Sequence, residues 1–184
     1  MDNQLLILEG SASVMRSKIQ ISDFLTFRLG WWCPRILFID SKANMESKNS
    51  DLLIWFETRS KLTHLTWTSP SRQNTAQFIT DILYKNNIES IVYIEPDFSP
   101  ARLLDEFWIE LGSALKQERE SCIFFNCCQA EEKRPIGFAV NKKLIQEQMN
   151  DDFPLFKKEL IRNYSFSKQL EVVPNLFHPI NSNV

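Results

Sequence analysis

The fold class is decided by the stretch Leu5-Leu6-Ile7-Leu8-Glu9-Gly10-Ser11-Ala12-Ser13-Val14-Met15-Arg16-Ser17. Its first four residues form an apolar run that is typical of a buried strand. A polar segment beginning at Gly10 follows, and residues 15–29 then place apolar side chains at helical spacing. The chain therefore begins as strand, loop and helix, the opening of an α/β domain.

The same alternation continues along the chain. Strands that are near-continuous apolar runs, separated by helices, indicate a mostly parallel sheet with helices on both faces. No repeat, low-complexity segment or linker divides the chain, so we expect one domain over residues 1–184. Strands are expected at residues 5–8, 35–40, 62–68, 90–95 and 122–127, with weaker patterns at 136–140 and 170–173; helices are expected at 15–29, 51–60, 73–84, 100–119 and 142–149.

The segment from Gly10 to Ser17 lies where a phosphate-binding loop, G-x-x-x-x-G-K-[ST], joins a strand to a helix. Gly10 and Ser17 match this template, whereas Met15 replaces the second glycine and Arg16 replaces the lysine. Met15 adds a side chain where the backbone must approach the phosphates closely, and the planar guanidinium of Arg16 is no equivalent of a compact ammonium. Ser17 retains the hydroxyl that can ligate Mg²⁺. The pattern allows weak ATP binding, but it favours an anchoring loop with no ligand.

Polar residues stand at the ends of the expected strands. In parallel sheets, ligands bind outside the carboxyl ends of the strands, and these ends carry Gly10, Asp40, Glu95 and Asn126. Asp40 and Glu95 fit a metal-binding role and an exposed surface carboxylate equally well.

Composition excludes several classes of protein. The formal net charge of −2 lacks the basic excess of a strong nucleic-acid binder. The four cysteines, at positions 33, 122, 127 and 128, have no zinc-site spacing, which predicts buried thiols, no metal site and a reducing compartment. No signal peptide or apolar run near 18 residues is present, so we expect no membrane contact and a nuclear or cytoplasmic location.

The order of these motifs resembles the RecA-like core of strand-exchange recombinases and their paralogues. Gly10 to Ser17 corresponds to the Walker A loop, Asp40-Ser41-Lys42 to the Asp-x-Glu strand end, and Ile91 to Glu95 to the Walker B strand. Asn126 corresponds to the polar sensor residue. The resemblance covers roughly residues 4 to 130. It implies a RecA-like P-loop core with degenerate Walker motifs.

The same resemblance implies a function. Lys42 replaces the family's catalytic acid, and a protonated lysine cannot act as a general base. The resemblance therefore implies a chain that is not an enzyme and holds no cofactor, with ATP and Mg²⁺ doubtful. It would act in homologous recombination and DNA repair by pairing with another recombinase paralogue or with the recombinase itself, to load or stabilise filaments on single-stranded DNA. The alternatives are a structural pseudo-ATPase subunit, as in Elongator's accessory ring, and a weak ATP-binding sensor.

Three basic groups and one aromatic pair complete the candidates. Lys142-Lys143, Lys157-Lys158 and Arg162 could contact phosphates, but such short groups are more often solvated surface. Trp31-Trp32 fits an interaction patch and a core position equally well.

Overall fold

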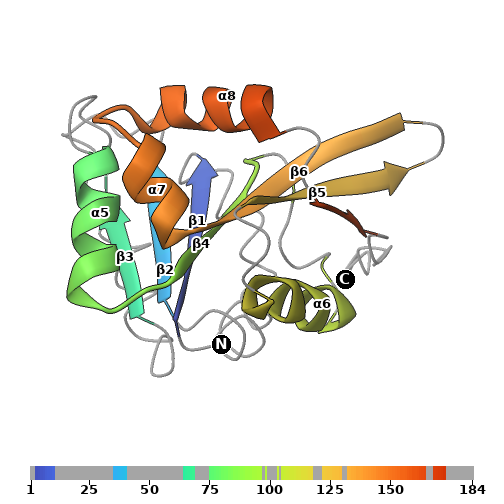
Figure 1. Ribbon diagram of the computed structural model, residues 1–184, viewed down its shortest axis with the longest axis horizontal. Coiled ribbons are helices and arrows are strands. Elements are labelled where there is room, and N and C mark those ends of the chain that lie inside the picture. The colour runs from blue at the N-terminus through green and yellow to red at the C-terminus, as the bar shows by residue number, and fades with distance from the viewer. Residues whose placement is uncertain are drawn as a thin grey trace, which may run out of the picture.

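The computed structural model describes residues 3–10, 35–40, 64–68, 75–96, 98, 103, 105–117, 122–129, 132–164 and 168–172. Its centre is a seven-stranded sheet with the order β3-β2-β1-β4-β6-β5-β7 (Figure 1). The strands are β1 (Gln4–Gly10), β2 (Arg35–Asp40), β3 (His64–Thr68), β4 (Ser90–Ile94), β5 (Cys122–Gln129), β6 (Glu132–Asn141) and β7 (Lys168–Val172).

One half of the sheet is parallel and has β1 at its middle. Ile7 of β1 pairs with Leu37 of β2 on one side and with Tyr93 of β4 on the other. Strand β3 then adds to β2, also in parallel. Because all four strands run the same way, their carboxyl ends meet at one edge, where Gly10 pairs with Asp40.

The other half contains an antiparallel hairpin. Strand β6 pairs antiparallel with β5 and with β4, so it lies between two strands that precede it in the sequence. Only Ala130 and Glu131 separate β5 from β6, which is too short for the helical crossover that a parallel pair needs. The sheet is therefore mixed, and the expected mostly parallel sheet is wrong in this half.

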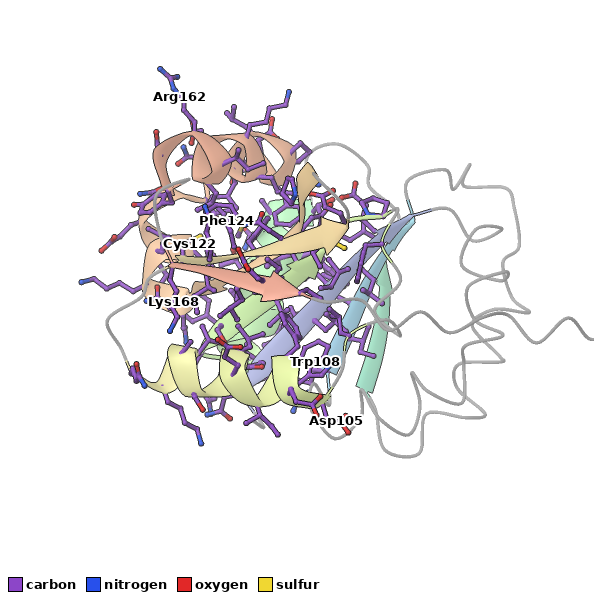
Figure 2. The ribbon with its side chains drawn as sticks, turned by 90° about the vertical axis from the view of Figure 1, so that its right-hand side faces the viewer. Asp105, Trp108, Cys122, Phe124, Arg162 and Lys168 are labelled. Atoms are coloured by element: carbon purple, nitrogen blue, oxygen red, sulfur yellow. The ribbon has the colours of Figure 1, made fainter. Side chains whose placement is uncertain are left out.

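Helices cover both faces of the sheet. They are α5 (Thr75–Lys85), α6 (Asp105–Lys116), α7 (Lys142–Gln148) and α8 (Phe153–Tyr164). Side chains alternate along a strand: Leu5 and Ile7 pack in the cluster with α5, α7 and α8, whereas Leu6 and Leu8 pack in the cluster with α6. Figure 2 shows α6 and α8 on opposite sides of the sheet, with Trp108 directed from α6 toward the strands.

Most expected elements are confirmed. The strand at residues 35–40 has the expected bounds, and the helix expected at 73–84 is α5. The helix expected at 100–119 is confirmed as α6, which begins at Asp105 and ends at Lys116. Helix α8 was not expected. The helices expected at 15–29 and 51–60 lie outside the described residues.

The expectation on the cysteines can also be compared with the structure. Cys122 and Cys127 are buried free thiols, as expected. No described helix has the length and apolar character needed to cross a membrane. The single domain over residues 1–184 stays a prediction, as do the absent cofactor and the cellular location.

Candidate functional site

The direction of sheet growth reverses between β1 and β4. From β1 the chain adds β2 and then β3 on one side, and it returns to place β4 on the other side of β1. At such a switch point the two flanking connections leave the sheet in different directions and open a crevice outside the carboxyl ends of the strands. The candidate site is therefore the edge formed by the ends of β1, β2 and β4.

Three predicted site residues are brought to this edge. Gly10 is the last residue of β1, and its partner in the register, Asp40, is the last residue of β2. Glu95 directly follows β4, is half-buried, and its main-chain N–H donates a 2.8 Å hydrogen bond to the carbonyl oxygen of Ile136. The ends of β1, β2 and β4 therefore lie at one edge of the sheet.

The remaining predicted site residues do not join them. Met15, Arg16 and Ser17 lie outside the described residues, so the phosphate-loop hypothesis stays a prediction. Asn126 is not at a strand end, because β5 continues to Gln129. Its buried amide Nδ2 donates a 2.9 Å hydrogen bond to Oε1 of Gln169 on the neighbouring strand β7, a structural contact.

A polar cluster that the sequence analysis missed lies at the same edge. The hydroxyl of Tyr93 donates a 2.8 Å hydrogen bond to Oε2 of Glu9. The ammonium Nζ of Lys157, from α8, lies 2.5 Å from the same oxygen and donates a 3.0 Å hydrogen bond to the Tyr93 hydroxyl. Glu9, Tyr93 and Lys157 thus form a closed triangle of hydrogen bonds, which we call the edge triad.

Aromatic rings surround the lysine of the edge triad. Nζ of Lys157 lies 4.5 Å from the ring centre of Tyr93 and 5.2 Å from that of Phe153. An ammonium near an aromatic face is attracted by the negative face of the ring. The side chains of Lys157 and Glu9 are only 18% and 23% exposed, so this ion pair is screened less than one on the open surface.

The surroundings of Tyr93 keep its hydroxyl protonated. Burial is the largest cause that raises the pKa of its hydroxyl far above the ordinary value, and the charges of Glu9 and Glu95 raise it further. Tyr93 is therefore a neutral hydrogen-bond donor at physiological pH. The buried phenol of Tyr93 is thus surrounded by the carboxylates of Glu9 and Glu95 and by the ammonium of Lys157.

The sequence explains why these three groups meet. Glu9 lies two residues after Ile7, and Tyr93 is the partner of Ile7 in the register of β4. Because Ile7 and Tyr93 pack in the cluster with α8 and side chains alternate along a strand, Glu9 and Tyr93 both lie on the face that α8 covers. On α8, Phe153, Phe156 and Leu160 are buried at helical spacing, and Lys157 lies beside them at the margin of this apolar face. Lys158 and Arg162 are exposed, and Figure 2 shows Arg162 directed away from the sheet.

The described residues do not complete a metal site at this edge. Within the described ranges, no group of three His, Cys, Asp or Glu side chains could hold a metal ion. The carboxylate of Glu9 is already paired with Lys157. A divalent cation would therefore need ligands from a substrate or from other residues.

A groove lies at the opposite edge of the sheet. This groove of about 710 Å³ runs along the amino ends of β1 and β4, where α6 ends and α7 begins. It is separated from the edge triad by the length of β1. Its lining residues are Asn3, Gln4, Glu89, Ser90, Gly112, Leu115, Lys116, Asn141, Lys142 and Lys143.

Comparisons with solved structures identify proteins that share this fold. The sequence matches no protein-family model and no curated protein. A cytidylyltransferase from Leptospira borgpetersenii is similar over 95% of this chain and 77% of its own, with a TM-score of 0.57 and 14% identity. A CMP:2-keto-3-deoxy-manno-octonic acid synthetase complexed with CTP is similar over 94% of this chain and 90% of its own (TM-score 0.56, 8% identity). A mannosyltransferase from Pyrobaculum calidifontis, in complex with GDP-Man and Mn²⁺, is similar over 93% of this chain and 55% of its own (TM-score 0.52, 13% identity).

These similarities correct the resemblance drawn from the sequence. The similar structures are nucleotidyltransferases and a glycosyltransferase, so the RecA-like core and the recombinase paralogue are wrong. The roles in homologous recombination and DNA repair lose their basis with them. The expectation that the chain is not an enzyme is contradicted as well, because the proteins that share its fold are enzymes.

The physical reason for the error is that strand–helix alternation does not specify strand order. The same alternation of strands and helices along the sequence is compatible with different orders of the strands in the sheet. Here β6 lies antiparallel between β4 and β5, and the alternation does not predict that position. The expected recombinase partner rested on the same resemblance, and no contact in the structure bears on it. The chain thus has a mixed α/β fold, which it shares with these nucleotidyltransferases and with the mannosyltransferase.

Proposed function

We propose that the chain is a nucleotidyltransferase that binds a nucleoside triphosphate, with CTP as the first candidate, at the edge formed by β1, β2 and β4. The observation that carries the proposal is the edge triad at the switch point of this fold. The similarity to the synthetase complexed with CTP extends over 94% of this chain and 90% of that one, which favours the same class of reaction.

The groups at the edge suit a polyphosphate ligand. Lys157 supplies an ammonium, a compact charge that pairs well with phosphate oxygens. Glu95 supplies a carboxylate, and a nucleotide that arrives with Mg²⁺ suits it, since this cation is held by one or two carboxylates together with the phosphates. The raised pKa of Tyr93 keeps its hydroxyl protonated, so it adds no negative charge against the phosphates.

Calorimetric titration tests the proposal directly. The protein is titrated with CTP, UTP, ATP and GTP in the presence of Mg²⁺, and pyrophosphate release is then measured with sugar acids as acceptors. We expect one pyrimidine triphosphate to bind at micromolar concentrations. A chain that binds none of the four triphosphates contradicts the proposal.

A matched pair of variants locates the site. Glu95→Gln removes a carboxylate at the carboxyl edge, and we expect it to weaken triphosphate binding at least fivefold. Glu89→Gln makes the same change at an exposed position of the opposite edge, beside the 710 Å³ groove, and leaves binding unchanged. The reverse result would move the site to that groove.

The mannosyltransferase similarity supports a second candidate, a glycosyltransferase that binds a nucleotide sugar. This candidate is weaker, because the chain covers only 55% of that enzyme. The same titration separates the two: GDP-mannose or another nucleotide sugar would bind more tightly than any triphosphate if the chain were a glycosyltransferase.

A further inference from the structure

One carboxylate oxygen holds both of the donors in the edge triad. Oε2 of Glu9 accepts the hydrogen bond from Tyr93 at 2.8 Å and lies 2.5 Å from Nζ of Lys157. An ammonium has three donors, and the described contacts of Lys157 direct two of them to Glu9 and Tyr93. Its remaining N–H is not required by these contacts.

The stem of Lys157 is fixed while its charge stays close to solvent. The rings of Tyr93 and Phe153 flank the ammonium at 4.5 and 5.2 Å, and the side chain is 18% exposed. Phe153 precedes Lys157 by one helical turn and is itself buried in the core, so it anchors the position from which the lysine extends.

A phosphate chain competes well for this ammonium. It carries several negative charges where Glu9 carries one, and its contact with an ammonium is a charge-assisted hydrogen bond of the strong kind. We propose that Lys157 pairs with Glu9 at the carboxyl edge in the ligand-free protein, and that the phosphates of the nucleotide replace Glu9 as the partner of Lys157 when the nucleotide binds. The proposal rests on the proposed function and names Lys157 as the phosphate-binding group of that site.

Two substitutions should then change binding in opposite directions. Lys157→Met removes the ammonium and weakens CTP binding tenfold or more. Glu9→Gln keeps a hydrogen-bond acceptor but removes the competing charge, so CTP binds at least threefold more tightly. Cytidine, which has no phosphate, shows neither change. A pair with a merely structural role would shift both variants in the same direction, for both ligands.

Matched controls keep the test falsifiable if a variant is unstable. Lys158→Met removes the adjacent, exposed lysine of α8 and leaves CTP binding unchanged. Lys157→Arg retains the charge and binds CTP within about fivefold of the wild type. Thermal unfolding of each variant shows whether it is folded at the temperature of the titration. Equal affinity of the wild type and Lys157→Met for CTP overturns the proposal.

Inorganic pyrophosphate separates this inference from the proposed function. If the wild type binds no nucleotide, the proposed function fails, and titration with pyrophosphate still tests Lys157 because this probe needs no base-binding pocket. Tighter pyrophosphate binding in Glu9→Gln and weaker binding in Lys157→Met support the exchange of Glu9 for phosphate at Lys157. Equal pyrophosphate binding, or none, in the wild type and both variants overturns it.

Discussion

A Cβ atom at Gly137 would stand 2.1 Å from the main-chain carbonyl oxygen of Tyr93. Real Cβ atoms do not approach a backbone atom so closely, and the nearest atom belongs to a strand in the middle of the sheet. Gly137 therefore permits β6 to approach β4 beside the residue that also forms part of the edge triad.

Gly137→Ala should be strongly destabilising. The added methyl must push β6 away from β4, and overpacking of this kind costs about 3 kcal/mol of unfolding free energy. Urea unfolding monitored by circular dichroism measures it. Pro135→Ala, at an exposed position of the same strand, is the control and should change the free energy by less than about 0.5 kcal/mol. Equal stability of the two variants would contradict the close approach.

Tyr93→Phe should lower the free energy of unfolding by about 1–2 kcal/mol, because two hydrogen bonds of the edge triad are lost while the buried ring remains. The ring stacking on Phe138, with centres 5.0 Å apart, is retained. Tyr84→Phe is the control, since the Tyr84 hydroxyl bonds with Gln146 at the exposed surface. It should cost less than about 0.5 kcal/mol in the same urea experiment.

Alkaline pH should destabilise the wild type more than Tyr93→Phe. The folded-state pKa of Tyr93 is raised above the unfolded value of about 10. Below pH 10 both states are protonated and the contribution of Tyr93 to stability is complete. Above it the unfolded chain loses the proton and the folded chain keeps it, so stability falls by about 1.4 kcal/mol per pH unit. Unfolding curves at pH 9 and 11 test this; equal losses in both proteins would refute it.

Trp108 of α6 should tolerate phenylalanine. Its side chain is fully buried, and its Nε1 has no hydrogen-bond partner in the part of the chain that the structure describes. Trp108→Phe loses apolar contact but also removes a buried donor, so the net change should stay within about 1.5 kcal/mol. Trp108→Ala should cost about 3–5 kcal/mol. Similar losses for both, by thermal unfolding, would indicate that the indole N–H is satisfied.

Asn141 should stabilise α7 through its side chain. Its Oδ1 accepts a 2.9 Å hydrogen bond from the main-chain N–H of Leu144, which caps the helix. Asn141→Ala should lower the free energy of unfolding by about 1 kcal/mol. Asn141→Asp keeps the acceptor and should stay within a few tenths of the wild type. If both variants lose the same amount, the cap contributes nothing.

The local elements of this fold are readable from the sequence where the pattern is unambiguous. The runs that became β1, β2 and β4 are apolar enough to specify buried strands without any tertiary information. Helix α8 is harder to predict, because only Phe153, Phe156 and Leu160 of its residues are buried. The sequence does offer one indication, because an aspartate followed by an apolar residue and a proline favours a helix start. In the structure, Oδ1 of Asp152 accepts a 2.9 Å hydrogen bond from the main-chain N–H of Leu155.

Some residues of the candidate site can likewise be predicted from the sequence, and others cannot. Gly10, Asp40 and Glu95 could be predicted, because residues at the ends of parallel strands meet at one edge whatever the strand order is. Lys157 could not, since 148 positions separate it from Glu9 and its place beside the apolar face of α8 is visible only once that segment is recognised as a helix. Its role depends on which side of α8 faces the sheet, and packing of the whole helix decides that.

The position of β6 has a consequence for how the chain is made. Strand β6 joins β4 to β5. Among the described strands made before residue 132, β3, β2, β1 and β4 can therefore form a parallel sheet that ends at β4, whereas β5 has no neighbour in that sheet. The exposed edge of β4 must wait for synthesis of residues 132–141 before it is covered. A nascent chain arrested before this point therefore leaves the edge of β4 open to chaperones, whereas in one arrested after residue 141 that edge is covered by β6.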